Sequence, residues 1–134
     1  MSGGIYQGKI LDHARNPRHR GVLEPADFSH EDTGLVCGDE VRIDLRVVGD
    51  RVVAVACSGR GCAVSQAAAS ILSELLANMA LADVRALTEE DLLAAIGVPL
   101  GPSRRECALL SLWVLRAGMA GGRVGVTDST ALPL

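Results

Sequence analysis

The sequence predicts an α+β fold, in which a small antiparallel β-sheet is covered on one face by helices. The first observation is the clean alternation of "EVRIDLRVVGD", residues 40–50, which ends in a Gly49-Asp50 turn signal. The second is that helical patterns dominate the chain after residue 62. The third is composition: 134 residues, 49% hydrophobic and 2% aromatic, suffice for one core of Leu, Val, Ile and Ala.

The N-terminal part predicts one helix and one irregular segment. A helix is expected over residues 5–15, ending at Asn16-Pro17 because the residue before a proline is pushed out of the helical region. The segment "RGVLEPADFSHEDTG" then forms a loop that leads into a first strand near Phe28.

A β-hairpin follows this loop. In the strand that begins near residue 40, the apolar side chains occupy every second position and face the core. The run "RVVAVACS", residues 51–58, turns back beside it as the second strand. Cys57 is in phase with Val53 and Val55 there, so we expect it to pack in the core.

Helices account for the remaining elements. A glycine-rich corner, "SGRGC", precedes a helix expected over residues 65–81. "TEEDLLAAI" predicts a short helix with Thr88 as N-cap and Asp91 three residues on. "SRRECALLSLWVLRAGM" predicts the last helix, with Ser103 and Glu106 in capping-box spacing.

Composition excludes several classes of protein. The net charge of −3 gives no basic footprint for nucleic acid. The N-terminus lacks the pattern of a signal peptide, and "AAASILSELLANMALA" is too short and too polar to span a membrane. We therefore expect a cytoplasmic protein with a single domain over residues 1–120 and a flexible tail over 121–134.

Cysteines lie at the ends of the predicted elements. Because disulfides rarely persist in the cytoplasm, the four cysteines there are more naturally metal-binding or reactive. Cys37 and Asp39 lie in the loop before the first hairpin strand, Cys62 lies in the glycine-rich corner, and Cys107 lies in the first turn of the last helix. Loops from separate elements can converge on one site, as functional residues on a rigid scaffold often do.

These four side chains predict a metal centre. Three thiolates and a carboxylate make the four ligands of a tetrahedral zinc site, and the same donors would also suit iron or an iron–sulfur cluster. The carboxylate of Asp39 is the hardest ligand and should be the easiest to displace. His13, His19 and His30 have no ligand spacing to these residues, and His13 and His19 are expected on the N-terminal surface.

Four separated segments resemble one known family. "IYQGKILDHARNPRHRG", "CGDEVRIDLRV", "GRGCAVSQAAAS" and "RRECALLSLWVL" are similar, in this order, to the IscU/SufU-type iron–sulfur cluster assembly proteins, also called NifU N-terminal-like. The resemblance covers roughly residues 5–118 and implies the SufE/NifU-like fold. It implies that Cys37, Asp39, Cys62 and Cys107 bind zinc or a nascent cluster. It also implies sulfur delivery as persulfide from a pyridoxal-phosphate cysteine desulfurase of the SufS/IscS type.

The sequence departs from both branches of this family. Arg105 stands where the IscU branch has a histidine before the third cysteine, and the loop "PLGPSRRE" replaces the Leu-Pro-Pro-Val-Lys chaperone segment. The span from Cys62 to Cys107 is too short for the insertion usual in SufU proteins. The site residues therefore resemble SufU, whereas the length of the middle segment resembles IscU.

Three functions are compatible with these residues. The first is a zinc-dependent acceptor of persulfide sulfur, an assembly factor similar to a sulfurtransferase rather than a classical enzyme, with Cys37 as acceptor and Cys107 as second choice. The second is a scaffold on which a [2Fe–2S] cluster is built and passed to downstream carrier or recipient proteins. The third is a structural zinc module, which an aspartate ligand disfavours.

Overall fold

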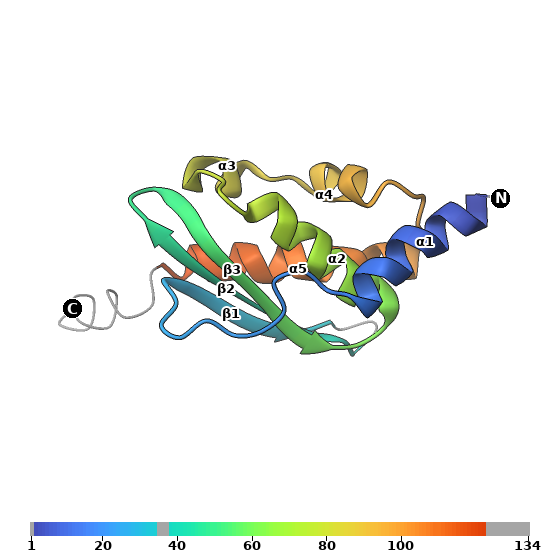
Figure 1. Cartoon of the computed structure of the whole chain (residues 1–134), viewed down its shortest axis with the longest axis horizontal. Coiled ribbons are helices and arrows are strands. Elements are labelled where there is room, and N and C mark those ends of the chain that lie inside the picture. Colours follow the sequence, from blue (N-terminus) through green and yellow to red (C-terminus); the bar gives the residue numbers. More distant parts are fainter. Residues whose placement is uncertain (1, 35–37, 123–134) are drawn as a thin grey trace.

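The computed structural model describes residues 2–34 and 38–122, with side chains from residue 8 onward (Figure 1). Three strands and five helices make up this part of the chain. In chain order they are α1 (Ser2–Arg15), β1 (Phe28–Thr33), β2 (Glu40–Val48), β3 (Arg51–Arg60), α2 (Ala63–Leu76), α3 (Leu81–Ala86), α4 (Glu89–Ile96) and α5 (Pro102–Ala120).

The strands form an antiparallel sheet in the order β1-β2-β3. Phe28 pairs with Leu45 across β1 and β2, and Ile43 pairs with Cys57 across β2 and β3. Backbone hydrogen bonds join Gly21 and His19 to Cys57, so the segment after α1 covers the outer edge of β3. The strand expected near Phe28 and the hairpin are therefore confirmed.

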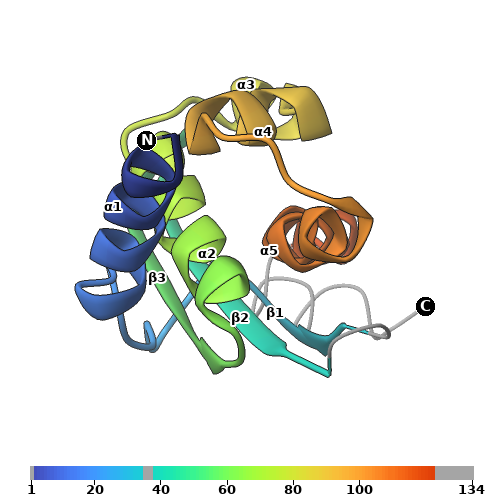
Figure 2. The ribbon, with the colours of Figure 1, turned by 90° about the vertical axis from the view of Figure 1, so that its right-hand side faces the viewer.

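The helices lie on one face of the sheet, as predicted. Figure 2 shows α2 and α5 side by side above the strands, α3 and α4 beyond them, and α1 along the outer side of α2. The core lies between the sheet and the α2–α5 layer, where Leu45, Leu72 and Leu112 are almost completely buried. The antiparallel sheet and its helical cover confirm the α+β class.

A β-bulge in β3 overturns one predicted orientation. Arg46 pairs with Ala54, but Val47 pairs with Val52, so Val53 is the extra residue. An extra residue reverses the inward–outward alternation. Val53 is therefore half exposed, and Val55 and Cys57 beyond the bulge are buried as expected.

The helix expected over residues 65–81 ends earlier than predicted. α2 ends at Leu76, and Asn78 follows with a φ of 66°, a left-handed conformation that asparagine tolerates better than most residues. Val52 donates its N–H to the carbonyl of Met79 (2.9 Å), which ties this break to the start of β3. The composition of the segment favours a helix throughout, but pairing with the sheet interrupts it.

The other helix starts give one confirmation and one correction. Thr88 and Asp91 form the predicted capping box at the start of α4. Ser103 is not the N-cap of α5, because Gly101 holds that position and Pro102 is the first helical residue. Proline favours this first position because its missing N–H would have no partner in the helix.

Two further predictions concern the C-terminal tail and membrane-spanning helices. The tail expected over residues 121–134 lies outside the described residues from 123 onward. Among the described helices, none is long and apolar enough to cross a membrane.

Candidate metal centre

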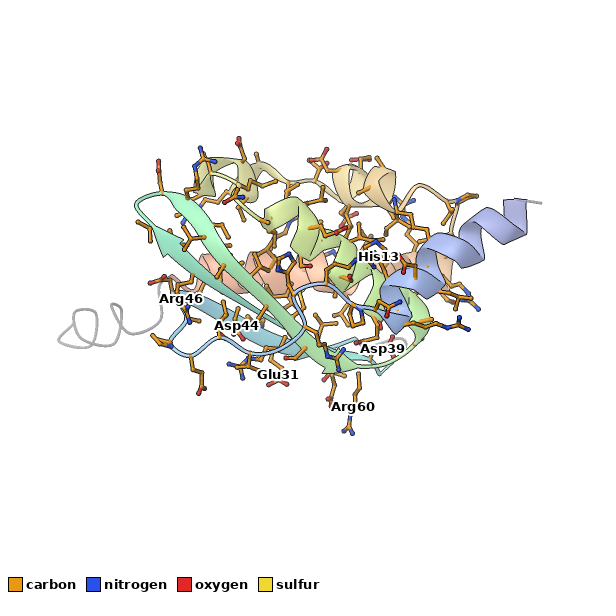
Figure 3. All side chains as sticks on the ribbon, in the orientation of Figure 1. His13, Glu31, Asp39, Asp44, Arg46 and Arg60 are labelled. Atoms are coloured by element: carbon orange, nitrogen blue, oxygen red, sulfur yellow. The ribbon has the colours of Figure 1, made fainter. Side chains whose placement is uncertain are left out.

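Three of the four predicted ligands converge at one end of the sheet. One ligand atom each from Asp39, Cys62 and Cys107 lies within 4.8 Å of the others. They come from the start of β2, the corner before α2 and the N-terminal half of α5. Figure 3 shows Asp39 at this end, with Arg60 at the neighbouring end of β3. The fold therefore brings together donors that are far apart in the sequence.

Asp39 is held in position by its neighbours. The side chain is buried, and its Oδ1 accepts a hydrogen bond from the backbone N–H of Cys62 (3.2 Å). Its backbone carbonyl accepts another from Gly34 (2.7 Å). A Cβ at Gly61 would lie 2.4 Å from the carboxyl carbon of Asp39, so only glycine leaves room for this carboxylate.

Cys62 is the N-cap of α2. Its Sγ accepts a hydrogen bond from the backbone N–H of Ser65 (3.4 Å), as the oxygen of an N-cap serine would. Cys62 is also exposed, which leaves its sulfur open to a metal ion or to a reaction partner.

Cys107 is buried and lies deeper in its helix than predicted. Since α5 begins at Pro102, Cys107 is its sixth residue and lies in the second turn. The benefit of the helix end falls off within the first turn, so it acts more weakly on Cys107 than the sequence suggests. Arg104 and Arg105 are exposed in the turn before it, at the same end of the molecule.

The donor set fits a thiolate-binding metal ion. Two sulfurs and one carboxylate oxygen are ligands that zinc accepts, and ligand atoms around a tetrahedral zinc ion lie about 3.8 Å apart at bond lengths of about 2.3 Å. The observed separations, within 4.8 Å, approach that arrangement. Cys37, the fourth predicted ligand, lies outside the described residues, so its place in the site stays a prediction.

Cys57 and the three histidines are not members of this cluster. Cys57 packs in the core as predicted, and burial raises the pKa of its thiol to about 12. The prediction of a surface position is wrong for His13, which is buried against α2 with Nδ1 2.8 Å from Ser70 Oγ (Figure 3). His19 is exposed as expected, and His30 lies on β1.

Sequence reasoning missed two features of the site. It identified the glycine-rich corner but not the reason for Gly61, which makes room for the carboxylate of Asp39. It placed Cys62 in the corner but did not identify it as the N-cap. The second feature had a signal, because Cys62 directly precedes an apolar helical run, but cysteine is not among the usual capping residues.

Comparison with known proteins identifies the family to which this fold belongs. The sequence profile described as the NifU-like N terminal domain matches residues 5–121. Three similar proteins are the bifunctional protein NifU/MnmA of Rubrobacter xylanophilus, the zinc-dependent sulfurtransferase SufU of Bacillus subtilis and the iron–sulfur cluster assembly scaffold protein IscU of Thermotoga maritima. Their identities are 34%, 28% and 34%, over 80%, 87% and 64% of this chain.

The matches differ in how much of each relative they cover. The chain spans 90% of the SufU protein, 61% of the IscU protein and 22% of the NifU/MnmA protein. Among solved structures, the FiSufU protein of Fervidobacterium islandicum AW-1 superimposes with a TM-score of 0.72 at 26% identity. That match covers 89% of this chain and 99% of the FiSufU chain, so the whole described fold is shared.

Proposed function

This chain belongs to the NifU-like N-terminal domain family, and from that membership we propose that it accepts persulfide sulfur from a cysteine desulfurase during iron–sulfur cluster assembly. The observation that carries the proposal is the convergence of Asp39, Cys62 and Cys107 within 4.8 Å. The similarity to a zinc-dependent sulfurtransferase over 90% of that protein's length supports it. Downstream carrier or recipient proteins in the cytoplasm would then take the sulfur or the cluster.

The proposed ligands of the metal ion are Cys37, Asp39, Cys62 and Cys107. A zinc ion held by them would keep the sulfurs deprotonated and fix the loops relative to one another. The carboxylate of Asp39 is positioned to bind a metal ion, because Gly61 leaves room for it and the N–H of Cys62 donates a hydrogen bond to it. The covalent chain keeps Cys37 only two residues from this carboxylate.

Sulfur transfer to Cys37 is a thiol–persulfide exchange. The Cys37 thiolate attacks the outer sulfur of the desulfurase persulfide, and a new S–S bond forms on Cys37. The S–S bond of the donor breaks, and the desulfurase cysteine leaves as a thiolate. The exchange conserves electrons and therefore needs no oxidant or reductant. Burial of Cys107 makes it a poorer acceptor, because an attacking thiolate must reach its partner.

The test combines metal analysis with desulfurase kinetics on one preparation. We expect about one zinc ion per chain, as a tetrahedral site would hold, and a stimulation of desulfurase turnover that Cys37→Ala abolishes. Cys57→Ala is the matched control, because this buried thiol lies outside the cluster and its loss should leave stimulation intact. Mass spectrometry after reaction with cysteine should find persulfide on Cys37. Persulfide only on Cys62 or Cys107 would refute the choice of acceptor.

A change of one ligand separates metal affinity from reactivity. Asp39→Cys should bind zinc more tightly, because a thiolate is the softer ligand, and should accept sulfur more slowly because the site opens less easily. Zinc competition with a chromophoric chelator and the rate of persulfide formation give the two readouts. Equal or faster sulfur acceptance by this variant would contradict the idea that Asp39 is displaced.

A scaffold role is the second candidate. The same donors suit a [2Fe–2S] cluster, and a relative at 34% identity is named as a scaffold protein. Anaerobic reconstitution with iron and sulfide provides the test. Visible absorbance that stays with the protein through gel filtration, without stimulation of the desulfurase, would favour this role over sulfur acceptance.

A further inference from the structure

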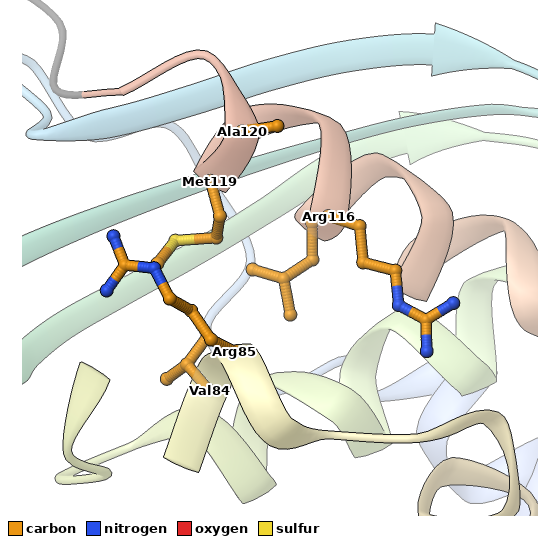
Figure 4. A pocket seen from close by; sticks show the side chains of 6 residues that line it. Val84, Arg85, Arg116, Met119 and Ala120 are labelled. Atoms are coloured by element: carbon orange, nitrogen blue, oxygen red, sulfur yellow. The ribbon is translucent and has the colours of Figure 1, made fainter. Parts of the chain in front are cut away.

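A second candidate site lies at the opposite end of α5 from the cysteines. It is a cavity of about 220 Å³ between α3 and the C-terminal turns of α5 (Figure 4). Its lining residues are Val84, Arg85, Leu115, Arg116, Met119 and Ala120. Cys107 and Met119 are separated by 12 residues of one helix, or about 18 Å at about 1.5 Å per residue. A molecule in this cavity would therefore leave the metal centre accessible.

The cavity combines apolar walls with two guanidinium groups. Val84, Leu115 and Met119 are buried side chains that supply the walls. Figure 4 shows the guanidinium groups of Arg85 and Arg116 on opposite sides of these walls. An apolar group with negative charges on both sides would match this arrangement.

The two arginines differ in how they are already engaged. Arg116 donates to the carbonyl of Leu87 (3.2 Å) and lies 4.0 Å from Glu89, and half of its side chain is exposed. Within the described residues, Arg85 has no side-chain hydrogen bond or ion pair and is exposed. Arg85 is therefore available to a carboxylate without breaking an existing contact.

An exposed tryptophan extends the same surface. Trp113, the single tryptophan of the chain, is 40% exposed and precedes Arg116 by one helical turn. Glu89 orients it by accepting a hydrogen bond from its indole N–H (3.0 Å). Tryptophan and arginine are enriched among the residues that contribute most to protein–protein binding. An exposed tryptophan next to an arginine therefore indicates a surface that binds another protein.

We propose that this cavity, with Trp113 beside it, docks an acidic segment of a partner protein that inserts one or two apolar side chains between Arg85 and Arg116. The volume suits one or two side chains better than a drug-sized ligand, since pockets for such ligands usually measure about 300–1,000 Å³. No side chain among the described residues pairs with the charge of Arg85, so an acidic partner would be selected by pairing with it. The inference does not depend on zinc binding or sulfur transfer.

The experiment titrates the zinc-treated, ¹⁵N-labelled full chain with the blocked peptide acetyl-EELLEE-amide and follows backbone amide shifts. We expect saturable shifts confined to residues 84–86 and 113–120. Neither acetyl-KKLLKK-amide, with reversed charge, nor acetyl-EESSEE-amide, without apolar side chains, should produce them. Arg85→Glu should weaken binding about tenfold, which corresponds to about 1.4 kcal/mol. Arg15→Glu, the same charge change at an exposed position on α1, should leave binding unchanged.

Several results would overturn the proposal. They are the absence of saturable shifts at millimolar peptide, equal binding of the lysine peptide, and unchanged affinity of Arg85→Glu. Octanoate that displaces the peptide at lower concentration would identify a small carboxylate as the occupant instead. Cys107→Ala should bind the peptide like the wild type, so failure of the metal-centre proposal and failure of this one are distinguishable.

Discussion

At the scale of single residues, the metal centre depends on the lack of a side chain at Gly61. Gly61 and Asp39 lie at the ends of different strands, yet the carboxylate of Asp39 occupies the space in which a Cβ at position 61 would lie. The backbone of Gly61 also has a φ of 155°, which L side chains rarely adopt. Gly59 is equally confined, because a Cβ there would lie 2.1 Å from the carbonyl oxygen of Glu40. Both glycines therefore allow β2 and the end of β3 to meet closely.

Gly61→Ala should weaken zinc binding. The added methyl group would lie about 2.5 Å from Oδ1 of Asp39 and would displace the carboxylate from the two sulfurs. We expect at least about a tenfold loss of zinc affinity, or about 1.4 kcal/mol, in a competition titration with a chromophoric chelator.

The control for this variant is Gly8→Ala. Gly8 lies within α1, and a Cβ there would meet nothing within 4 Å. Alanine favours a helix over glycine, so this variant should fold at least as well and keep its zinc affinity. Unchanged affinity in Gly61→Ala would show that Asp39 does not bind the metal ion or can move without cost.

At the scale of helices and strands, the sequence predicted those features that depend on residues close together in the chain. The alternation in β2 and the capping box at Thr88 and Asp91 were readable because each involves residues close in sequence. The bulge at Val53 and the helix break at Asn78 were not, because both arise where β3 pairs with another segment. The same holds for the site. The positions of Asp39, Cys62 and Cys107 at the ends of predicted elements identified them as candidate ligands. The contact between Gly61 and Asp39 could not be predicted, because the two residues meet only in the folded chain.

The two predicted capping residues should behave differently when replaced. Thr88→Ala removes the acceptor for the N–H of Asp91 (3.1 Å) and should lower the free energy of unfolding by about 1 kcal/mol. Ser103→Ala should change it by less than about 0.5 kcal/mol, because Ser103 is exposed inside α5 and Gly101 is the N-cap. Urea unfolding of both variants gives the comparison. A larger loss for Ser103→Ala would mean that α5 starts at Ser103 after all.

His13 makes the packing of α1 on α2 sensitive to acid. Burial, assisted by Arg18, lowers the pKa of His13 below its ordinary value of 6.5, and Glu74 opposes the shift. As pH falls through 6.5, the unfolded chain binds a proton that the folded chain resists, so the free energy of unfolding decreases. Above that value the imidazole is neutral in both states and this contribution is constant.

Replacement of this histidine should flatten the pH dependence. His13→Asn keeps a polar group near Ser70 but cannot be protonated, so it should lose less stability than the wild type between about pH 7.5 and about pH 5.5. Urea unfolding of the chelator-treated protein at several pH values is the measurement. His19→Asn is the control, because it makes the same substitution at an exposed histidine outside the α1–α2 contact. Identical slopes for all three proteins would show that His13 is not the sensitive group.

At the scale of the whole molecule, the metal centre and the core meet along the same helices. Cys62 caps α2 and Cys107 lies on α5, and these two helices form the layer that covers the sheet. Asp39 adds the loop before β2. A metal ion bound there would cross-link three parts of the fold, while the cavity at Arg85 and Arg116 stays free at the other end of α5.

Zinc should therefore stabilise the whole fold and not only its ligand loops. Free zinc at about a thousand times its Kd would add about 4 kcal/mol to the free energy of unfolding, because the ion binds the folded chain preferentially. For a chain of this length, that corresponds to a rise in Tm of roughly 10–15 °C. Calorimetry of the wild type with zinc and with chelator measures the rise. Cys107→Ala should lose most of it, because one of the converging sulfurs is missing.

Cys57→Ala separates metal binding from ordinary loss of packing. Its thiol is as buried as that of Cys107 and is held away from the cluster, with Sγ 3.5 Å from the carbonyl of Ala69. The variant should lose about 1–2 kcal/mol of its free energy of unfolding, and its Tm without zinc should be lower. Zinc should still raise its Tm by the full amount. If both alanine variants kept the rise, zinc would be binding elsewhere. If both lost it, the rise would reflect the integrity of the core, and only loss confined to Cys107→Ala links zinc to the converging side chains.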